Sequence, residues 1–212
     1  AQDLILRHRV NNYRAGDLER RYAELGVEED FFVNYGYITR ALQGLMHPRS
    51  HSCVPADDVG KPWPLAQRKR AQLLLEFVNK HGTVHPREVD QYFSHGRVTN
   101  YWGGSSNATT HLLDEMHYLG LLRIARREKG IRIYAAQEFA PLEMDEPERR
   151  ARIDAMADVV VRIYAPVPGP SLSYYLRRLR YAAPQWKGEL PAALSRAKER
   201  LSHSRIDAVD WY

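Results

Sequence analysis

Nine histidines are the residues of this sequence best suited to metal binding or proton transfer, but their spacing does not form a site. No two of them lie with a glutamate on one face of a predicted helix, as the ligands of zinc proteases do. His47 and His51 are four residues apart, yet Pro48 between them opposes a continuous helix. Cys53 is the single cysteine, so neither a disulfide nor a cysteine zinc cage can form within the chain, and a reducing compartment is expected. We therefore expect no metal and no cofactor.

Runs of polar and basic residues are better suited to contact with nucleic acid. Asparagine can form two hydrogen bonds with adenine, threonine can contact a phosphate or the methyl group of thymine, and arginine and lysine neutralise phosphates. The polar run consists of Asn107, Thr109, Thr110 and His111. The first basic run consists of Arg126, Arg127, Lys129 and Arg132. A later basic set consists of Arg177, Arg178, Arg180, Arg196, Lys198, Arg200 and Arg205. Such runs also form ordinary solvated faces, and that alternative stays open.

The segment Gly103–Ser106 precedes a predicted helix and could bind an anion through its backbone N–H groups. It lacks the lysine of the Walker motif, so we do not expect it to bind a nucleoside triphosphate. A DNA phosphate could lie there, or the serines could simply cap the helix. Tyr101 and Trp102, just before it, could stack on a base or pack beneath the loop.

Residues 65–139 are predicted to form the domain that carries the first two runs. Apolar spacing predicts a helix over 65–80 and a second helix that starts at Pro86 and continues over 88–93. The inner face of the first helix is expected to consist of Ala66, Leu73, Leu74, Phe77 and Val78. A third helix is predicted from a cap at Ser105 or Ser106 to Leu119, and strands over 121–126 and 131–135 flank a turn. Three helices followed by a β-hairpin is the order of a winged helix, whose third helix usually enters the major groove while the hairpin follows the DNA backbone.

Residues 145–212 repeat this order. Helices are predicted over 146–164, 171–183 and 190–201, followed by a strand over 206–212 that lacks its partner. We interpret this segment as a second winged-helix domain that is truncated in its wing. The later basic set then lies on its second and third helices, except Arg205, which follows the third helix.

The first quarter of the sequence is less regular. Residues 1–50 contain a predicted helix over 17–25, a strand over 30–38 and a short helix over 40–46, which we interpret as the remnant of an N-terminal winged-helix domain. Residues 51–64 are rich in proline and predict a linker. The expected fold class is mainly α with small β-hairpins (α+β), built from tandem winged-helix domains.

The charge distribution agrees with a polyanionic partner, although many enzymes are equally basic. The net charge is +5 and the isoelectric point about 9.3. Residues 1–64 contain 8 lysines and arginines and 9 acidic residues. The corresponding numbers are 11 and 7 in residues 65–139, and 12 and 9 in residues 145–212. No apolar run approaches the roughly 20 residues of a membrane span, and no signal sequence is evident. Because there is no initiator methionine and the chain stops within a predicted strand, we expect a fragment of a longer protein.

Three stretches together resemble a known family. They are LILRHRV with NNY over 4–13, FFVNYGYITRAL with LMHPR over 31–49, and LLDEMHYLGLLRIARREKGIRIYAA over 112–136. With them the chain resembles, as a divergent member, the YcaQ/AlkZ-like winged-helix DNA glycosylases, also described as winged helix DNA-binding domain-containing proteins. The resemblance implies tandem winged helices, and a role in DNA repair by excising alkylated bases or unhooking interstrand crosslinks.

The resemblance also implies a mechanism. N7 alkylation makes a purine a good leaving group, so an enzyme mainly needs to orient a water and stabilise the cationic sugar. The family's Gln-X-Gln or Gln-X-Asp motif would lie several residues before Ala1, so the catalytic residues are unknown here and we expect these 212 residues to release no base. Asn34 and Tyr35 stand where crosslink-repair members carry a His-Glu-Ala run, and the resemblance implies that they face the lesion.

The sequence therefore predicts a DNA-binding protein of the cytoplasm, associated with the nucleoid, with double-stranded DNA as its partner and a monomeric state. The alternative is a non-catalytic winged-helix transcription factor or protein-interaction scaffold.

Overall fold

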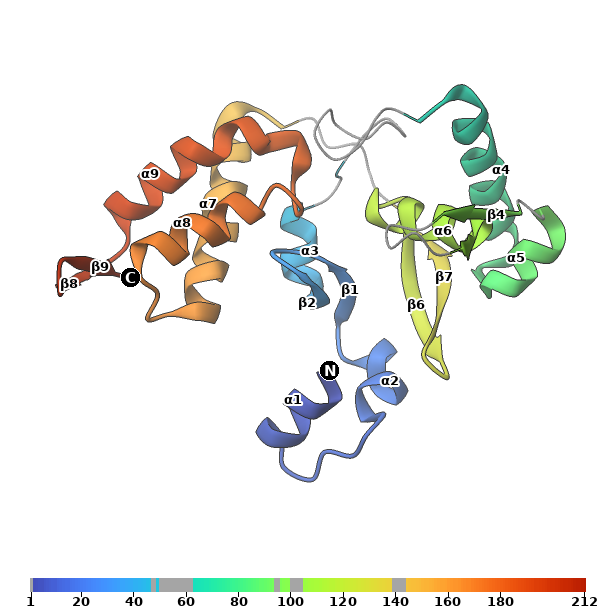
Figure 1. Cartoon of the computed structure of the whole chain (residues 1–212), viewed down its shortest axis with the longest axis horizontal. Helices are drawn as coiled ribbons and strands as arrows, with labels where there is room; N and C mark the ends of the chain where they lie inside the picture. Colours follow the sequence, from blue (N-terminus) through green and yellow to red (C-terminus); the bar gives the residue numbers. More distant parts are fainter. Residues whose placement is uncertain (1, 47–48, 50–62, 94–95, 100–104, 139–143) are drawn as a thin grey trace. The chain divides into compact units, whose positions relative to one another are not determined.

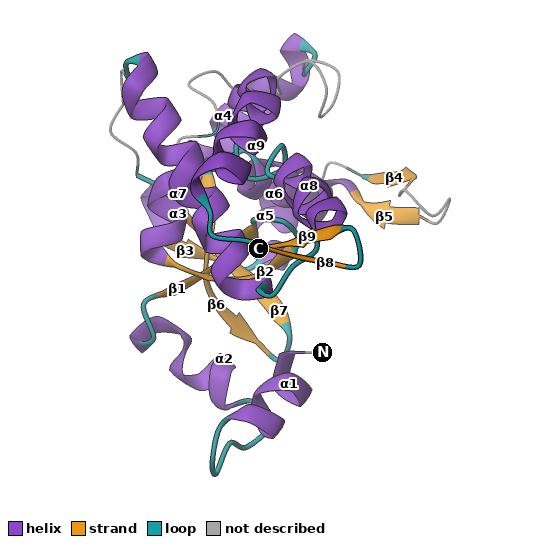
Figure 2. Cartoon of the chain, turned by 90° about the vertical axis from the view of Figure 1, so that its left-hand side faces the viewer, coloured by secondary structure: helices purple, strands orange, loops and turns teal. Residues whose placement is uncertain are grey.

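The computed structural model describes residues 2–46, 49, 63–93, 96–99, 105–138 and 144–212. Contacts between Cα atoms divide the chain into two compact units. The first unit contains residues 1–28 and 69–137, and the second contains residues 29–68 and 138–212. Helices predominate and the sheets are small and antiparallel (Figure 2), which confirms the expected mainly helical α+β class.

The first unit has two short N-terminal helices and a compact body. Their bounds are α1 (Gln2–Arg9), α2 (Asp17–Arg21), η1 (Tyr22–Glu24), α4 (Leu65–His81), β3 (Thr83–Val84), α5 (Pro86–Phe93), β4 (Arg97–Thr99), β5 (Ser105–Asn107), α6 (Ala108–Tyr118), β6 (Leu122–Glu128) and β7 (Ile131–Ala136). The first four residues of α4 belong to the second unit. Strands β3, β7 and β6 form one antiparallel sheet in that order, and α6 contacts both α5 and β6.

The start of α6 differs from the sequence prediction. Ser105 and Ser106 do not cap the helix, because they lie in β5 and pair with Thr99 and Val98 of β4. Asn107 caps it instead: its side-chain oxygen accepts a hydrogen bond of 3.0 Å from the Thr110 backbone N–H. The pairing with β4 extends the backbone up to Asn107, so the helix cannot begin earlier.

The long first helix of the body has a narrower buried face than its sequence predicts. Leu74 and Val78 are fully buried, as expected, whereas Leu73 is 55% exposed and Phe77 is only half-buried. The ring of Phe77 instead contacts His81, Tyr92 and Phe93 at the surface. The first unit therefore buries only one side of α4.

A two-residue turn joins β6 to β7. Lys129 and Gly130 both have positive φ angles, of 51° and 82°, and the flanking residues Glu128 and Ile131 are paired. This is the geometry of a type I′ turn, which favours Asn-Gly because asparagine and glycine adopt positive φ angles more readily than other residues.

We expect Lys129→Asn to raise the free energy of unfolding by a few tenths to about 1 kcal/mol, because asparagine tolerates the left-handed backbone better than lysine. Thermal unfolding measures the change. Lys129→Val, which is β-branched, should lower the melting temperature. If valine were tolerated as well as asparagine, the turn would not have this geometry.

The second unit joins an N-terminal hairpin and helix to three C-terminal helices (Figure 1). Its elements are β1 (Val27–Phe31), β2 (Tyr35–Thr39), α3 (Arg40–Met46), α7 (Glu146–Tyr164), α8 (Gly169–Arg178), η2 (Pro184–Glu189), α9 (Leu190–Arg200), β8 (Ser204–Ile206) and β9 (Val209–Trp211). The first two residues of β1 belong to the first unit. Helices α3 and α7 have the predicted bounds. Helix α7 begins with a capping box in which Asp145 and Glu148 exchange hydrogen bonds.

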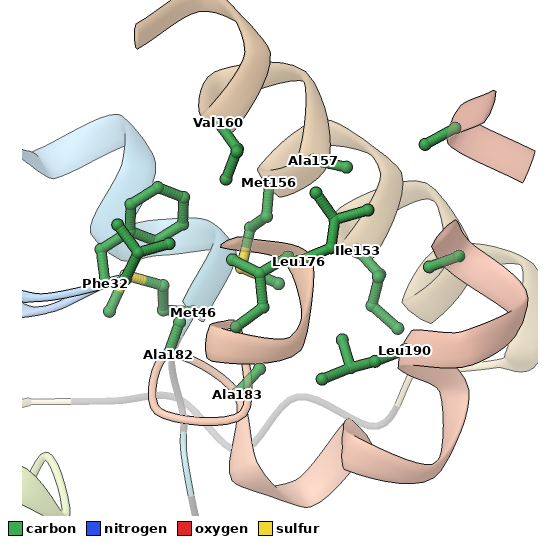
Figure 3. Close-up of a cluster of buried hydrophobic side chains, with 14 of the residues drawn as sticks. Phe32, Met46, Ile153, Met156, Ala157, Val160, Leu176, Ala182, Ala183 and Leu190 are labelled. Atoms are coloured by element: carbon green, nitrogen blue, oxygen red, sulfur yellow. The ribbon is translucent and has the colours of Figure 1, made fainter. Parts of the chain in front are cut away.

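Residues 30–38 form a hairpin rather than the single predicted strand. The turn between β1 and β2 follows Phe32, whose N–H donates to the carbonyl of Asn34. Phe32 and Met46 then point into the same core as Ile153, Met156 and Leu176 (Figure 3). Residues 1–50, expected as one domain, are thus divided between the two units at residue 28, because this apolar face is buried against α7 and α8.

The C-terminal residues form a complete small hairpin where one unpaired strand was expected. Asp207 and Ala208 both have positive φ angles and turn β8 back onto β9 (Figure 2). Tyr212 then exchanges two backbone hydrogen bonds of 2.9 Å with Val167. This pairing ties the hairpin to the start of α8.

None of the described helices is both long and apolar enough to cross a membrane. Over the same residues, no three histidine, cysteine or acidic side chains are grouped as they would be to hold a metal ion.

Candidate nucleic-acid interface

A stripe of aromatic and basic side chains runs along α8 and the turn after it. We call Tyr174, Arg177, Arg178, Arg180 and Tyr181 the α8 stripe. Arg177 and Arg178 lie three and four residues after Tyr174 on one face of α8, and Tyr181 follows three residues later in the turn after the helix. The Arg178 guanidinium lies 5.6 Å from the ring centre of Tyr174 and 5.2 Å from that of Tyr181. Positive charge and aromatic surface therefore alternate along this face.

Contacts within the α8 stripe hold its rings and charges together. Arg180 lies 4.9 Å from the ring centre of Tyr181 and donates a 3.0 Å hydrogen bond to the Tyr181 hydroxyl. This hydrogen bond lowers the pKa of Tyr181 from its usual value, and the nearby guanidinium charges act in the same direction. Arg177 and Arg180 are exposed, so their positive charge faces solvent.

Arg178 attaches the α8 stripe to the turn between β1 and β2. Its Nε donates to the carbonyl of Val33 at 2.6 Å, and its Nη2 donates to the side-chain oxygen of Asn34 at 2.8 Å. Asn34, predicted to face a lesion, is exposed and lies beside the stripe. Its neighbour Tyr35 is half-buried and donates a 2.7 Å hydrogen bond to Glu29. The structure thus brings Asn34, but not the Tyr35 hydroxyl, to this surface.

The two arginines predicted as DNA contacts on α9 are paired with acids on α7. Arg196 binds both carboxylate oxygens of Asp154, with its shortest contact at 2.8 Å. Arg200 binds both oxygens of Asp158 at 2.6 and 3.0 Å. These hydrogen bonds raise the pKa of each guanidinium. Because each pair is bidentate, both arginines join α9 to α7.

The residues at the start of α6 that were predicted to contact bases differ in their exposure to solvent. Asn107 caps the helix, and Thr109 is fully buried, where its hydroxyl donates a 2.8 Å hydrogen bond to Asp90. Thr110 and His111 are exposed, and His111 lies 3.2 Å from Glu115. Only the last two therefore present exposed side chains on the first turns of α6.

The arginines of the β6–β7 hairpin also have partners. Arg126 binds Glu128 at 2.6 Å, Arg127 donates to the Gly130 carbonyl at 2.9 Å, and Arg132 binds Asp114 at 2.6 Å. Asp114 also accepts a hydrogen bond from Tyr134, whose pKa is raised by burial and by this neighbouring carboxylate. Lys129 is exposed at the turn. The adjoining acids thus reduce the positive charge of this hairpin.

Sequence reasoning named the three arginines of the α8 stripe but not its tyrosines. The signal was available, because Tyr174 and Tyr181 lie seven residues apart around Arg177 and Arg178. Several other candidates, namely Tyr101, Trp102, Gly103, Gly104, His47, His51 and Cys53, lie outside the described residues.

Comparison with known proteins places the chain in a family. A family model described as DNA glycosylase AlkZ-like matches residues 1–210. No curated protein and no solved structure matches the chain.

Proposed function

The chain belongs to the AlkZ-like DNA glycosylase family, and from this premise we propose that it binds double-stranded DNA in the repair of alkylated bases. The reaction class of such repair is hydrolysis of the bond between an alkylated base and its sugar. Because N7 alkylation already makes the purine a good leaving group, the protein mainly has to hold the DNA and orient a water. The described residues are suited to the first of these tasks.

The α8 stripe is the observation that carries this proposal. Its arginines suit phosphates, since guanidinium groups bind phosphate oxygens through paired hydrogen bonds. Tyr174 is 51% exposed and can stack on an unpaired base or pack against a deoxyribose. Asn34, held by Arg178, adds an amide that can donate to and accept from a base edge.

The element orders support winged helices as the scaffold. In the first unit α4, β3, α5, α6, β6 and β7 follow one another, with β3 completing the sheet of the hairpin. In the second unit α7, α8 and α9 precede the β8–β9 hairpin. Both are the order of a winged helix. In this arrangement α9 is the recognition helix, and the α8 stripe belongs to the helix before it and the turn that follows. In helix-turn-helix proteins this preceding helix crosses the DNA backbone.

We expect the chain to bind a 20-base-pair duplex with an affinity that falls as salt rises, by about 0.9 logarithmic units per tenfold salt for each phosphate contacted. Fluorescence anisotropy at 50 to 300 mM salt measures this slope. A slope near zero, or no binding at 50 mM salt, would contradict the proposal. Incubation with duplexes containing N7-methylguanine then tests for base release, and release would show that a catalytic group lies within these 212 residues.

A further inference from the structure

A pocket of about 550 Å³ opens beside the α8 stripe, entirely within the second unit. It lies among the end of α8, the 3₁₀ helix η2 and the start of α9. Its volume falls within the roughly 300–1,000 Å³ of pockets that bind small molecules. The pocket is therefore large enough for one planar ring with its substituents.

The residues that line this pocket have two chemical characters. Leu176, Leu190 and Leu194, together with two prolines, supply apolar surface. Arg177, Arg180 and Lys187 supply positive charge, and Tyr181 supplies an aromatic ring. The lining includes no aspartate or glutamate. Such a site favours a ligand that is apolar and planar at one end and anionic at the other.

We propose that this pocket binds one unpaired nucleotide of the DNA held by the α8 stripe, with its base on the apolar surface and its phosphate on the cations. This inference rests on the proposed function, because Arg177, Arg180 and Tyr181 belong to both the stripe and the pocket. A nucleotide that leaves the duplex at the stripe would keep its phosphate beside the same arginines while its base enters the pocket. DNA with an extrahelical nucleotide is therefore the preferred form.

The shared chemistry of a base and a phosphate also belongs to a free nucleotide. The two sources differ in their connection to the stripe: an extrahelical nucleotide gains the contacts of the flanking strand, whereas a free nucleotide does not. Titration with deoxyguanosine monophosphate therefore provides a separate arm of the test. If the free nucleotide bound as tightly as the bulged duplex, the proposal that the ligand is an extrahelical nucleotide of DNA would be overturned.

The test uses two duplexes that differ only by one bulged 2-aminopurine nucleotide, whose fluorescence reports the surroundings of its base. We expect the bulged duplex to bind about tenfold more tightly than the paired one, the effect of burying and stacking one base. We also expect the 2-aminopurine signal to change on binding. Pro191 lines the pocket in the first turn of α9 and is exposed, so it can be replaced without disturbing the core.

Pro191→Glu places a carboxylate beside the proposed phosphate site, and an acid is favourable in the first turn of a helix, so folding is retained. This variant should bind both duplexes with nearly equal affinity, whereas the neutral control Pro191→Gln should keep the preference. Equal binding of the two duplexes by the wild type, or an unchanged preference in Pro191→Glu, overturns the pocket assignment while leaving duplex binding intact. If the wild type bound neither duplex, the result would instead contradict the proposed function.

Discussion

Replacing Arg49 with methionine is expected to lower the free energy of unfolding by about 3–5 kcal/mol, the cost of leaving one charge of a buried pair without its partner. The side chains of Arg49 and Asp30 are 1% and 2% exposed, and their closest atoms are 2.6 Å apart. Arg49 also donates to the backbone carbonyls of Phe31 and Ala182, at 2.7 and 3.1 Å. Arg49 therefore joins β1, through Asp30 and Phe31, to Ala182 in the turn after α8. Urea unfolding followed by circular dichroism measures the loss.

Two variants separate this effect from the simple removal of an arginine. Arg150→Met removes an arginine from an exposed pair with Glu146 on α7, and should change stability by less than about 1 kcal/mol. The double variant Asp30→Asn/Arg49→Met removes both buried charges and should recover part of the loss. If Arg49→Met cost no more than Arg150→Met, the buried pair would not hold the hairpin to the helices.

The largest expected effect on DNA binding comes from the α8 stripe. Arg177→Gln/Arg180→Gln removes its two exposed guanidinium groups while leaving Arg178, which supports the turn at Asn34. If each contacts one phosphate, the salt slope falls by about 1.8 and the affinity at 0.1 M salt falls by at least about tenfold. Anisotropy titrations over a range of salt concentrations measure both quantities on one duplex.

The matched control removes the same charge elsewhere in the second unit. Arg150→Gln/Arg162→Gln takes two exposed arginines from α7 without altering the α8 stripe. We expect the salt slope of this variant to stay within about half a unit of the wild type. Equal losses in both double variants would mean that net charge, rather than the stripe, determines binding.

The sequence predicted the bounds of α3 and α7 because their signals are local. The helix expected over 171–183 is instead α8 (Gly169–Arg178), and α1 (Gln2–Arg9) was not expected as a helix. Helix α7 begins and ends at the predicted residues, since the capping box of Asp145 and Glu148 and the apolar spacing of Ile153, Met156 and Val160 act within a few turns. The same holds for α3, which follows the hairpin directly. The strands at 122–128 and 131–136 were also located, because a lysine-glycine turn separates two alternating runs.

The partners of polar side chains could not be predicted in this way. Arg196 and Arg200 are basic residues on a helix, and only the packing of α7 against α9 shows that two aspartates bind them. Thr109 looks like a surface residue in sequence, but its burial depends on how α5 packs against α6. The electrostatic energy of a charged group depends on neighbours within a few ångströms, and those neighbours are often distant in sequence.

The sequence by itself determined the helix-rich class, the bounds of α3 and α7, the position of the β6–β7 hairpin, and the family resemblance that the comparison confirmed. Only the tertiary structure decided that residues 29–46 pack with the C-terminal helices and that Arg49 meets Ala182, 133 positions away. It also decided that Arg196 and Arg200 bind aspartates of α7, and that Arg177 and Arg180 line a pocket together with leucines and prolines. Local propensity specifies elements, whereas burial and charge pairing arise only when distant elements pack.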